Sequence, residues 1–153
     1  MMTGDMLPKA PIIETKFWVE GDELDPDEFT HLTGLQPTRK GKKGELSLNP
    51  MAAKRGVRIP ATFWVIEVER NTYSMDEGIQ EVLGSIWPHR ERILEYAHIR
   101  PSVKMGVTSV IHYSHDPPAY EVSRDSIEKL AYLGCEFGMG DIYKNEDEGD
   151  LEG

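Results

Sequence analysis

The sequence predicts an α+β fold in which two β-α-β units, joined by a broken helix, form a ferredoxin-like sheet of four mainly antiparallel strands with helices on one face. Three observations support this prediction. Apolar and polar residues alternate near the start of the chain, an apolar helical pattern in its middle is interrupted by Pro88, and a helix-start pattern recurs. The two copies of that pattern, residues 24–29 and 122–127, each stand between predicted strands.

The length of 153 residues suits one domain, because a chain of this size can bury about 70% of its unfolded surface in a single core. We expect that domain to span residues 1–143, followed by an acidic, disordered tail at 144–153. The single cysteine excludes an intramolecular disulfide, the first residues have no signal-peptide pattern, and no apolar run is long enough to cross a bilayer. The sequence therefore predicts a cytoplasmic protein.

The first strand is predicted over residues 13–19, where apolar and charged residues alternate. Trp18 is the exception, because it falls on the polar side of this strand. A short helix follows, with Asp25 as its N-cap, Pro26 at its first position and a glutamate three residues after the cap to complete a capping box. Gly34 ends the helix, since glycine tolerates the left-handed cap.

Residues 36–60 show no sustained periodicity, and we predict a long basic loop there, within which residues 45–48 could make a brief strand. Loops of more than about 12–15 residues are uncommon in compact domains unless they are functional or mobile. The segment has seven bases and one acid, Glu45, for a net charge of +6, although the whole chain carries −10. The bases are Arg39, Lys40, Lys42, Lys43, Lys54, Arg55 and Arg58.

The second strand is predicted over residues 62–69, which are apolar on both faces at their start. Ser74 begins a capping box that leads into a helix with apolar residues at helical spacing. Pro88 interrupts this spacing, so we expect a break near Trp87 and a second helix that ends before Pro101.

The third strand is predicted from about residue 103 to 113, and the fourth over residues 136–143, where two glycines suggest a bulge or a close backbone approach. Ser123 and Gly134 mark the two ends of the last helix. The predicted buried stripe of that helix consists of Ile127, Leu130, Ala131 and Leu133. The predicted core contains Phe17, Trp64, Ile66, Val107, Leu130 and Phe137.

Several stretches of the chain resemble a known family. They are residues 17–28 (FWVEGDELDPDE), 35–38 (LQPT), 43–45 (KGE), 127–134 (IEKLAYLG) and 141–143 (DIY). They are similar to the start and the end of a bacterial family catalogued as domain of unknown function 4279, over roughly residues 15 to 143. The family usually closes with alternating acidic and apolar residues, where this chain has Gly138 and Gly140. The resemblance implies a bacterial single-domain protein, and it implies no catalytic residue because the family has no established activity.

No residue pattern predicts a catalytic site, a metal site or a cofactor. The chain has no Cys-x-x-Cys, His-Glu-x-x-His or Gly-x-Ser-x-Gly motif. His112 and His115 are three residues apart in an extended segment, which directs them to opposite faces, and we expect surface or capping roles for the histidines. Cys135 follows a helix C-terminus, where the dipole disfavours a thiolate, so we expect it to be partly buried and unreactive.

The basic segment is the one feature that calls for a reason beyond folding. We predict a non-catalytic module that binds another protein, as an antitoxin-like inhibitor or accessory factor, because segregated charge steers association and selects partners. An alternative is phosphate-ligand or RNA binding through residues 38–58, with Trp18 as a stacking platform. An enzyme with an unrecognised site is the weaker alternative. The candidate binding residues are Arg39, Lys40, Lys42, Lys43, Lys54, Arg55 and Trp18.

Overall fold

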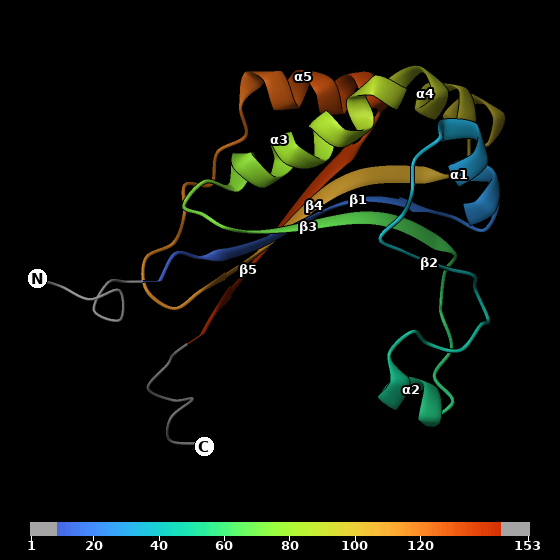
Figure 1. Cartoon of the computed structure of the whole chain (residues 1–153), viewed down its shortest axis with the longest axis horizontal. Coiled ribbons are helices and arrows are strands. Elements are labelled where there is room, and N and C mark those ends of the chain that lie inside the picture. The colour runs from blue at the N-terminus through green and yellow to red at the C-terminus, as the bar shows by residue number, and fades with distance from the viewer. Residues whose placement is uncertain (1–8, 145–153) are drawn as a thin grey trace, which may run out of the picture.

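A computed structural model describes residues 9–144 as a five-stranded open sheet with helices (Figure 1). The strand order is β2-β3-β1-β4-β5. The central strand β1 is antiparallel to β3 and β4, β2 is antiparallel to β3, and β4 is parallel to β5. The strands are β1 (Ile12–Glu20), β2 (Arg39–Gly41), β3 (Phe63–Asn71), β4 (Lys104–Tyr113) and β5 (Glu136–Tyr143).

One face of the sheet carries a layer of helices, and Figure 1 shows the short helix α2 below the sheet, away from that layer. The covering elements are α1 (Pro26–Thr33), α3 (Met75–Ile86), the 3₁₀ turn η2 (Trp87–His89), α4 (Arg90–Ile99) and α5 (Arg124–Leu133). Helix α2 (Pro50–Lys54) belongs to the segment between β2 and β3. No helix of the described residues is long and apolar enough to cross a membrane.

The core lies between the sheet and the helical layer. On β1 the residues 13, 15, 17 and 19 are fully buried, as the period of two predicts. Trp64 of β3 packs edge-on against Phe17 and Phe29, with ring centroids 6.1 and 4.6 Å away. Its indole N–H donates a hydrogen bond to Oγ1 of Thr30 over 2.9 Å, so the largest core side chain is also satisfied as a donor.

The predicted topology is corrected in two respects. The sheet has a fifth strand, β2, and the first predicted unit is not a parallel one, because β1 and β3 are direct antiparallel neighbours. In a split β-α-β unit of the ferredoxin-like kind a further strand separates the two. The second unit, β4-α5-β5, does have parallel neighbouring strands, and the two units lie side by side.

The predicted core is confirmed for Phe17, Trp64, Val107 and Leu130, and Ile66 packs against it while partly buried. Phe137 is wrong: 38% of it is exposed, because β5 is an edge strand that has a neighbour on one side only. In α5, Leu130 and Leu133 are buried as predicted, whereas Ile127 (54% exposed) and Ala131 face outward. The buried face of that helix is narrower than its apolar pattern.

The segment 36–60 is more structured than the predicted loop. It contains β2 and α2, and Leu46 forms a bridge with Arg58. Asn49 caps α2 and Pro50 opens it, which repeats the Asp25-Pro26 pattern of α1 on a helix with no buried residue. The acidic tail predicted for 144–153 lies outside the described residues except for Lys144.

Candidate functional site

The face of the sheet opposite the helices carries the candidate binding residues. Alternation places Lys16 and Trp18 of β1, Phe63 and Val65 of β3 and Thr108 of β4 on this open face, while their sequence neighbours point into the core. In the part of the chain that the structure describes, no helix covers this face (Figure 1). The open face is therefore available to a partner or ligand.

Trp18 lies across β4 instead of standing free. Its indole N–H donates a 2.9 Å hydrogen bond to Oγ1 of Thr108. The ring lies over Gly106, where a Cβ atom would approach it to 2.3 Å, so a glycine is required there for the tryptophan to rest on the sheet. Trp18 thus provides a fixed aromatic surface on the open face.

Two adjoining hollows, of about 390 and 430 Å³, form a groove on this face. Glu20, Arg39 and Phe63 line both hollows, so the groove is continuous through them. Toward the sheet centre it is also lined by Lys16, Trp18, Val19, Val65 and Thr108. At the other end it is lined by Ser47, Leu48, Asn49, Val57, Arg58, Ile59, Pro60 and Ala61. We refer to it as the arm groove.

The outer wall belongs to residues 42–62, which we call the arm. The arm folds back on itself, because Ser47 N–H donates to the Val57 carbonyl over 2.9 Å and Ile59 N–H donates to the Glu45 carbonyl over 2.8 Å. Its apolar side chains remain largely outside: Leu48 is 54% and Met51 66% exposed. An ordered segment that exposes apolar groups beside a groove is typical of a binding surface.

The predicted cationic residues are distributed unevenly around this groove. Arg39 lines it together with Trp18, and its guanidinium lies 3.4 Å from Glu67. Lys40 forms an ion pair with Asp27, whose pKa it lowers by hydrogen bonding and by charge. Lys43 lies 3.7 Å from Asp22.

The remaining predicted cations, Lys42, Lys54 and Arg55, are exposed and form no ion pair among residues 9–144. Lys54 and Arg55 stand at the end of α2 and line neither hollow. The structure therefore brings only Trp18 and Arg39 together in one site. The apolar residues Leu48, Val57 and Phe63 join them there.

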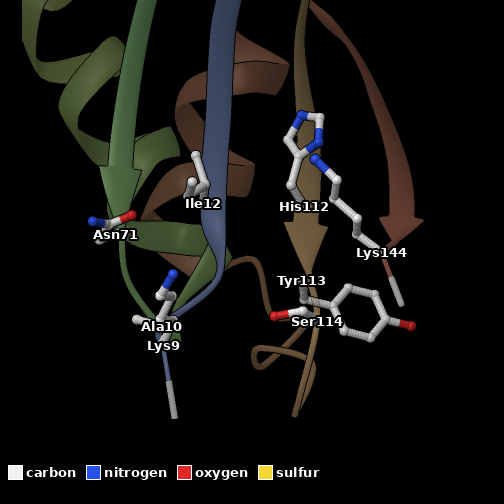
Figure 2. Close-up of a pocket in the computed structure, with 8 residues that line it drawn as sticks. All are labelled: Lys9, Ala10, Ile12, Asn71, His112, Tyr113, Ser114 and Lys144. Carbon is white, nitrogen blue, oxygen red and sulfur yellow. The ribbon is translucent and has the colours of Figure 1, made fainter. Parts of the chain in front are cut away.

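A second cavity of about 450 Å³, which we call the end cavity, lies at the opposite end of the open face (Figure 2). The strand register places Asn71, Ile12 and His112 abreast on β3, β1 and β4. The lining residues are Lys9, Ala10, Ile12, Asn71, His112, Tyr113, Ser114 and Lys144. Sequence reasoning missed this cavity, because the residues come from four separate segments and no local motif links them.

Two other side chains of reactive types, Cys135 and His89, have structural roles. Burial raises the pKa of the Cys135 thiol to about 12, which leaves it protonated and a poor nucleophile. His89 lies with Nδ1 2.6 Å from the Thr33 carbonyl at the end of α1, which is a capping role. Within residues 9–144 no three His, Cys, Asp or Glu side chains are grouped as a metal site.

The comparisons with known proteins place the chain in a family. No curated protein and no solved structure matches it. The family model described as domain of unknown function (DUF4279) matches residues 12–144, from the first strand to the end of the last. The match includes both the arm groove and most of the end cavity, so both are built on the family domain itself. The chain belongs to the DUF4279 family.

Proposed function

We propose that this protein is a non-catalytic module that binds an extended segment of another protein in the arm groove. The observation that carries the proposal is the groove itself. It is an aromatic and apolar channel on a sheet face that no helix of residues 9–144 covers, and it is bordered by an arm that exposes further apolar side chains. Interface cores are enriched in aromatic residues and arginine, and Trp18, Phe63 and Arg39 meet in this groove.

The charge of the groove defines the chemistry of the partner. Its lining contains three bases, Lys16, Arg39 and Arg58, and one acid, Glu20, in a chain with a net charge of −10. A partner segment that combines apolar side chains with carboxylates complements this lining. The basic arm attracts such a segment from a distance, and the acidic remainder of the molecule repels it elsewhere.

Nucleic acid is the less favoured ligand for the same surface. Arg39, Lys40 and Lys43 each face an acid of the chain itself, which reduces the positive charge available to phosphates. The indole N–H of Trp18 is already bonded to Thr108, and a single aromatic side chain is a small stacking platform.

Site-specific photo-crosslinking tests the proposal. A photoreactive amino acid replaces Leu48 in the groove wall. In a matched control it replaces Ile99, an apolar residue at the end of α4 that is also about half exposed. In cells of the organism that encodes the chain, we expect a discrete polypeptide adduct from position 48 and none from position 99. The captured protein, produced in purified form, should then bind the unmodified chain saturably.

Substitution within the groove completes the test. Leu48→Ser with Val57→Ser should weaken binding of that purified partner, while Ile99→Ser should leave it unchanged. The same adducts from both positions, or a partner that binds the groove variant normally, would contradict the proposal. Saturable quenching of tryptophan fluorescence by an oligonucleotide at low salt, together with the absence of a polypeptide adduct, would favour the nucleic-acid alternative.

A further inference from the structure

We propose that the end cavity binds a small organic anion that carries a carboxylate or phosphate group on an apolar body. This cavity and the arm groove have no lining residue in common. The inference therefore stands independently of the proposed protein-binding function.

The end cavity is held in place by the sheet. Lys144, directly after β5, donates its backbone N–H to the Tyr113 carbonyl over 2.8 Å. On the opposite side, Thr72 N–H donates to the Pro11 carbonyl over 3.0 Å, which fixes the chain two residues after Lys9. The backbone next to each lysine is thus hydrogen-bonded to the sheet.

The titratable side chains of the cavity wall include two lysines and a histidine, and no acid. These are Lys9, Lys144 and His112. Figure 2 shows the Lys144 side chain extending toward the His112 ring, so ammonium and imidazole flank the same space. The Glu14 carboxylate lies 3.6 Å from Nε2 of His112 and outside the lining.

His112 Nε2 is itself buried and makes no hydrogen bond within residues 9–144. Because this nitrogen is buried, the donors that the cavity offers to an anionic group are the two lysine ammonium groups, and the imidazole ring forms part of the wall. Charge-assisted hydrogen bonds of this kind are about twice as strong as neutral ones.

The remaining lining is mostly apolar, which decides between an inorganic and an organic anion. Ile12 and Ala10 provide aliphatic surface, whereas Figure 2 shows the Tyr113 ring extending away from them on the other side of β4. The volume of about 450 Å³ falls within the range of small-molecule sites. A phosphate ion alone would leave the apolar part unfilled, whereas an anion with an aromatic or aliphatic body would cover it.

Titrations of the full chain followed by backbone-amide NMR test the inference. The probes are phenyl phosphate and benzoate, with benzyl alcohol as the uncharged analogue and inorganic phosphate as the anionic group alone. We expect phenyl phosphate, benzoate or both to cause saturable amide shifts at Ile12, His112 and Lys144, with a dissociation constant below about 10 mM. Benzyl alcohol and inorganic phosphate should bind at least tenfold more weakly. Comparing benzoate with phenyl phosphate then shows whether the anion is a carboxylate or a phosphate.

A matched pair of double variants locates the binding. Lys9→Ser with Lys144→Ser should weaken the better probe roughly tenfold, whereas Lys42→Ser with Lys54→Ser, which removes the same charge from the arm, should change it less than twofold. Dispersed amide spectra confirm that each variant is folded. Equal binding of benzyl alcohol, equal binding of inorganic phosphate, an unchanged Lys9/Lys144 variant or no saturable shift would each overturn the inference.

Discussion

Trp64 connects the sheet to the first helix. It is fully buried, contacts two aromatic rings and bonds to Thr30 of α1. We expect Trp64→Ala to lower the free energy of unfolding by about 3–5 kcal/mol, because it removes the largest core side chain and leaves a cavity. Trp64→Phe should cost less, since it keeps an apolar ring. Urea unfolding checks both, and a loss below about 1 kcal/mol for alanine would contradict this account of the core.

Asp76 is a buried carboxylate with a structural role. Burial alone would raise its pKa, but hydrogen bonds from the Ser123 N–H and the side chains of Ser126 and Gln80 outweigh burial and lower the pKa. A carboxylate with a lowered pKa in the folded state contributes stability that is present above its unfolded pKa and is lost as the pH falls through the folded value. Asp76 therefore joins the start of α3 to the start of α5 in a pH-dependent way.

Replacing Asp76 with asparagine removes the ionisable carboxylate and so measures how much its charge contributes to stability. We expect Asp76→Asn to lower stability by about 1–3 kcal/mol at pH 7 and the difference from the parent protein to shrink below about pH 4. Thermal unfolding from pH 7 to pH 3 measures it. Exposed Asp125→Asn is the control, and a difference for Asp76→Asn that stays constant over this range would rule out the carboxylate as the cause.

At the scale of one element, helix α3 contains two glycines with opposite roles. A Cβ at Gly78 would come within 2.4 Å of Oγ1 of Thr15, which is buried and hydrogen-bonded to Ser109 on β4. A Cβ at Gly84 would meet no atom within 4 Å. Gly78 thus sets the distance between α3 and the sheet, while Gly84 only weakens the helix.

Alanine at the two positions should therefore act in opposite directions. We expect Gly78→Ala to cost about 1–3 kcal/mol through overpacking and Gly84→Ala to stabilise the protein by about 0.5–1 kcal/mol through helix propensity. Urea unfolding followed by circular dichroism measures both changes in the free energy of unfolding. The helix-to-sheet contact would be looser than described if both variants were stabilised.

The boundaries of most elements could be predicted because their signals are local. Asp25 accepts the N–H groups of Asp27 and Glu28, and Gly34 and Gly134 adopt the left-handed conformation. Ser74 illustrates the limit. Its side chain makes no cap bond, the Glu77 N–H donates to the Ser74 backbone carbonyl, and the Thr72 hydroxyl accepts the Ser74 N–H and donates to the Glu77 carboxylate. A three-residue strand such as β2 is too short for periodicity to reveal.

At the scale of the whole molecule, the sequence could predict the charged segment but not the sites. Strand alternation and charge clustering in the sequence were enough to select Trp18 and Arg39 as candidate binding residues. The sequence could not predict the strand order, because a period of two shows which face a residue occupies and not which strand lies beside it. The end cavity depends on that order, since it joins residues on β1, β3 and β4 with the residue after β5.

The distribution of charge over the molecule leads to the last prediction. Arg39, Lys40, Lys42 and Lys43 are exposed, and three of them form surface ion pairs. Exposed ion pairs of this kind contribute little net stability, so replacing all four residues with serine should leave the thermal stability nearly unchanged. The association rate with the protein captured at position 48 should fall about tenfold at low salt and less at high salt.

The control for this variant removes four positive charges that also form ion pairs with acids, at other places on the molecule. These are Arg70, Arg92, Arg124 and Lys129. If net charge alone governed association, both quadruple variants would slow it equally, because both change the total charge by the same amount. Steering by the basic residues 39–43 requires the Arg39/Lys40/Lys42/Lys43 variant to be slower, with similar dissociation rates for the two. Stopped-flow association at two salt concentrations distinguishes these cases, and early melting of that variant would show that the four cations are structural.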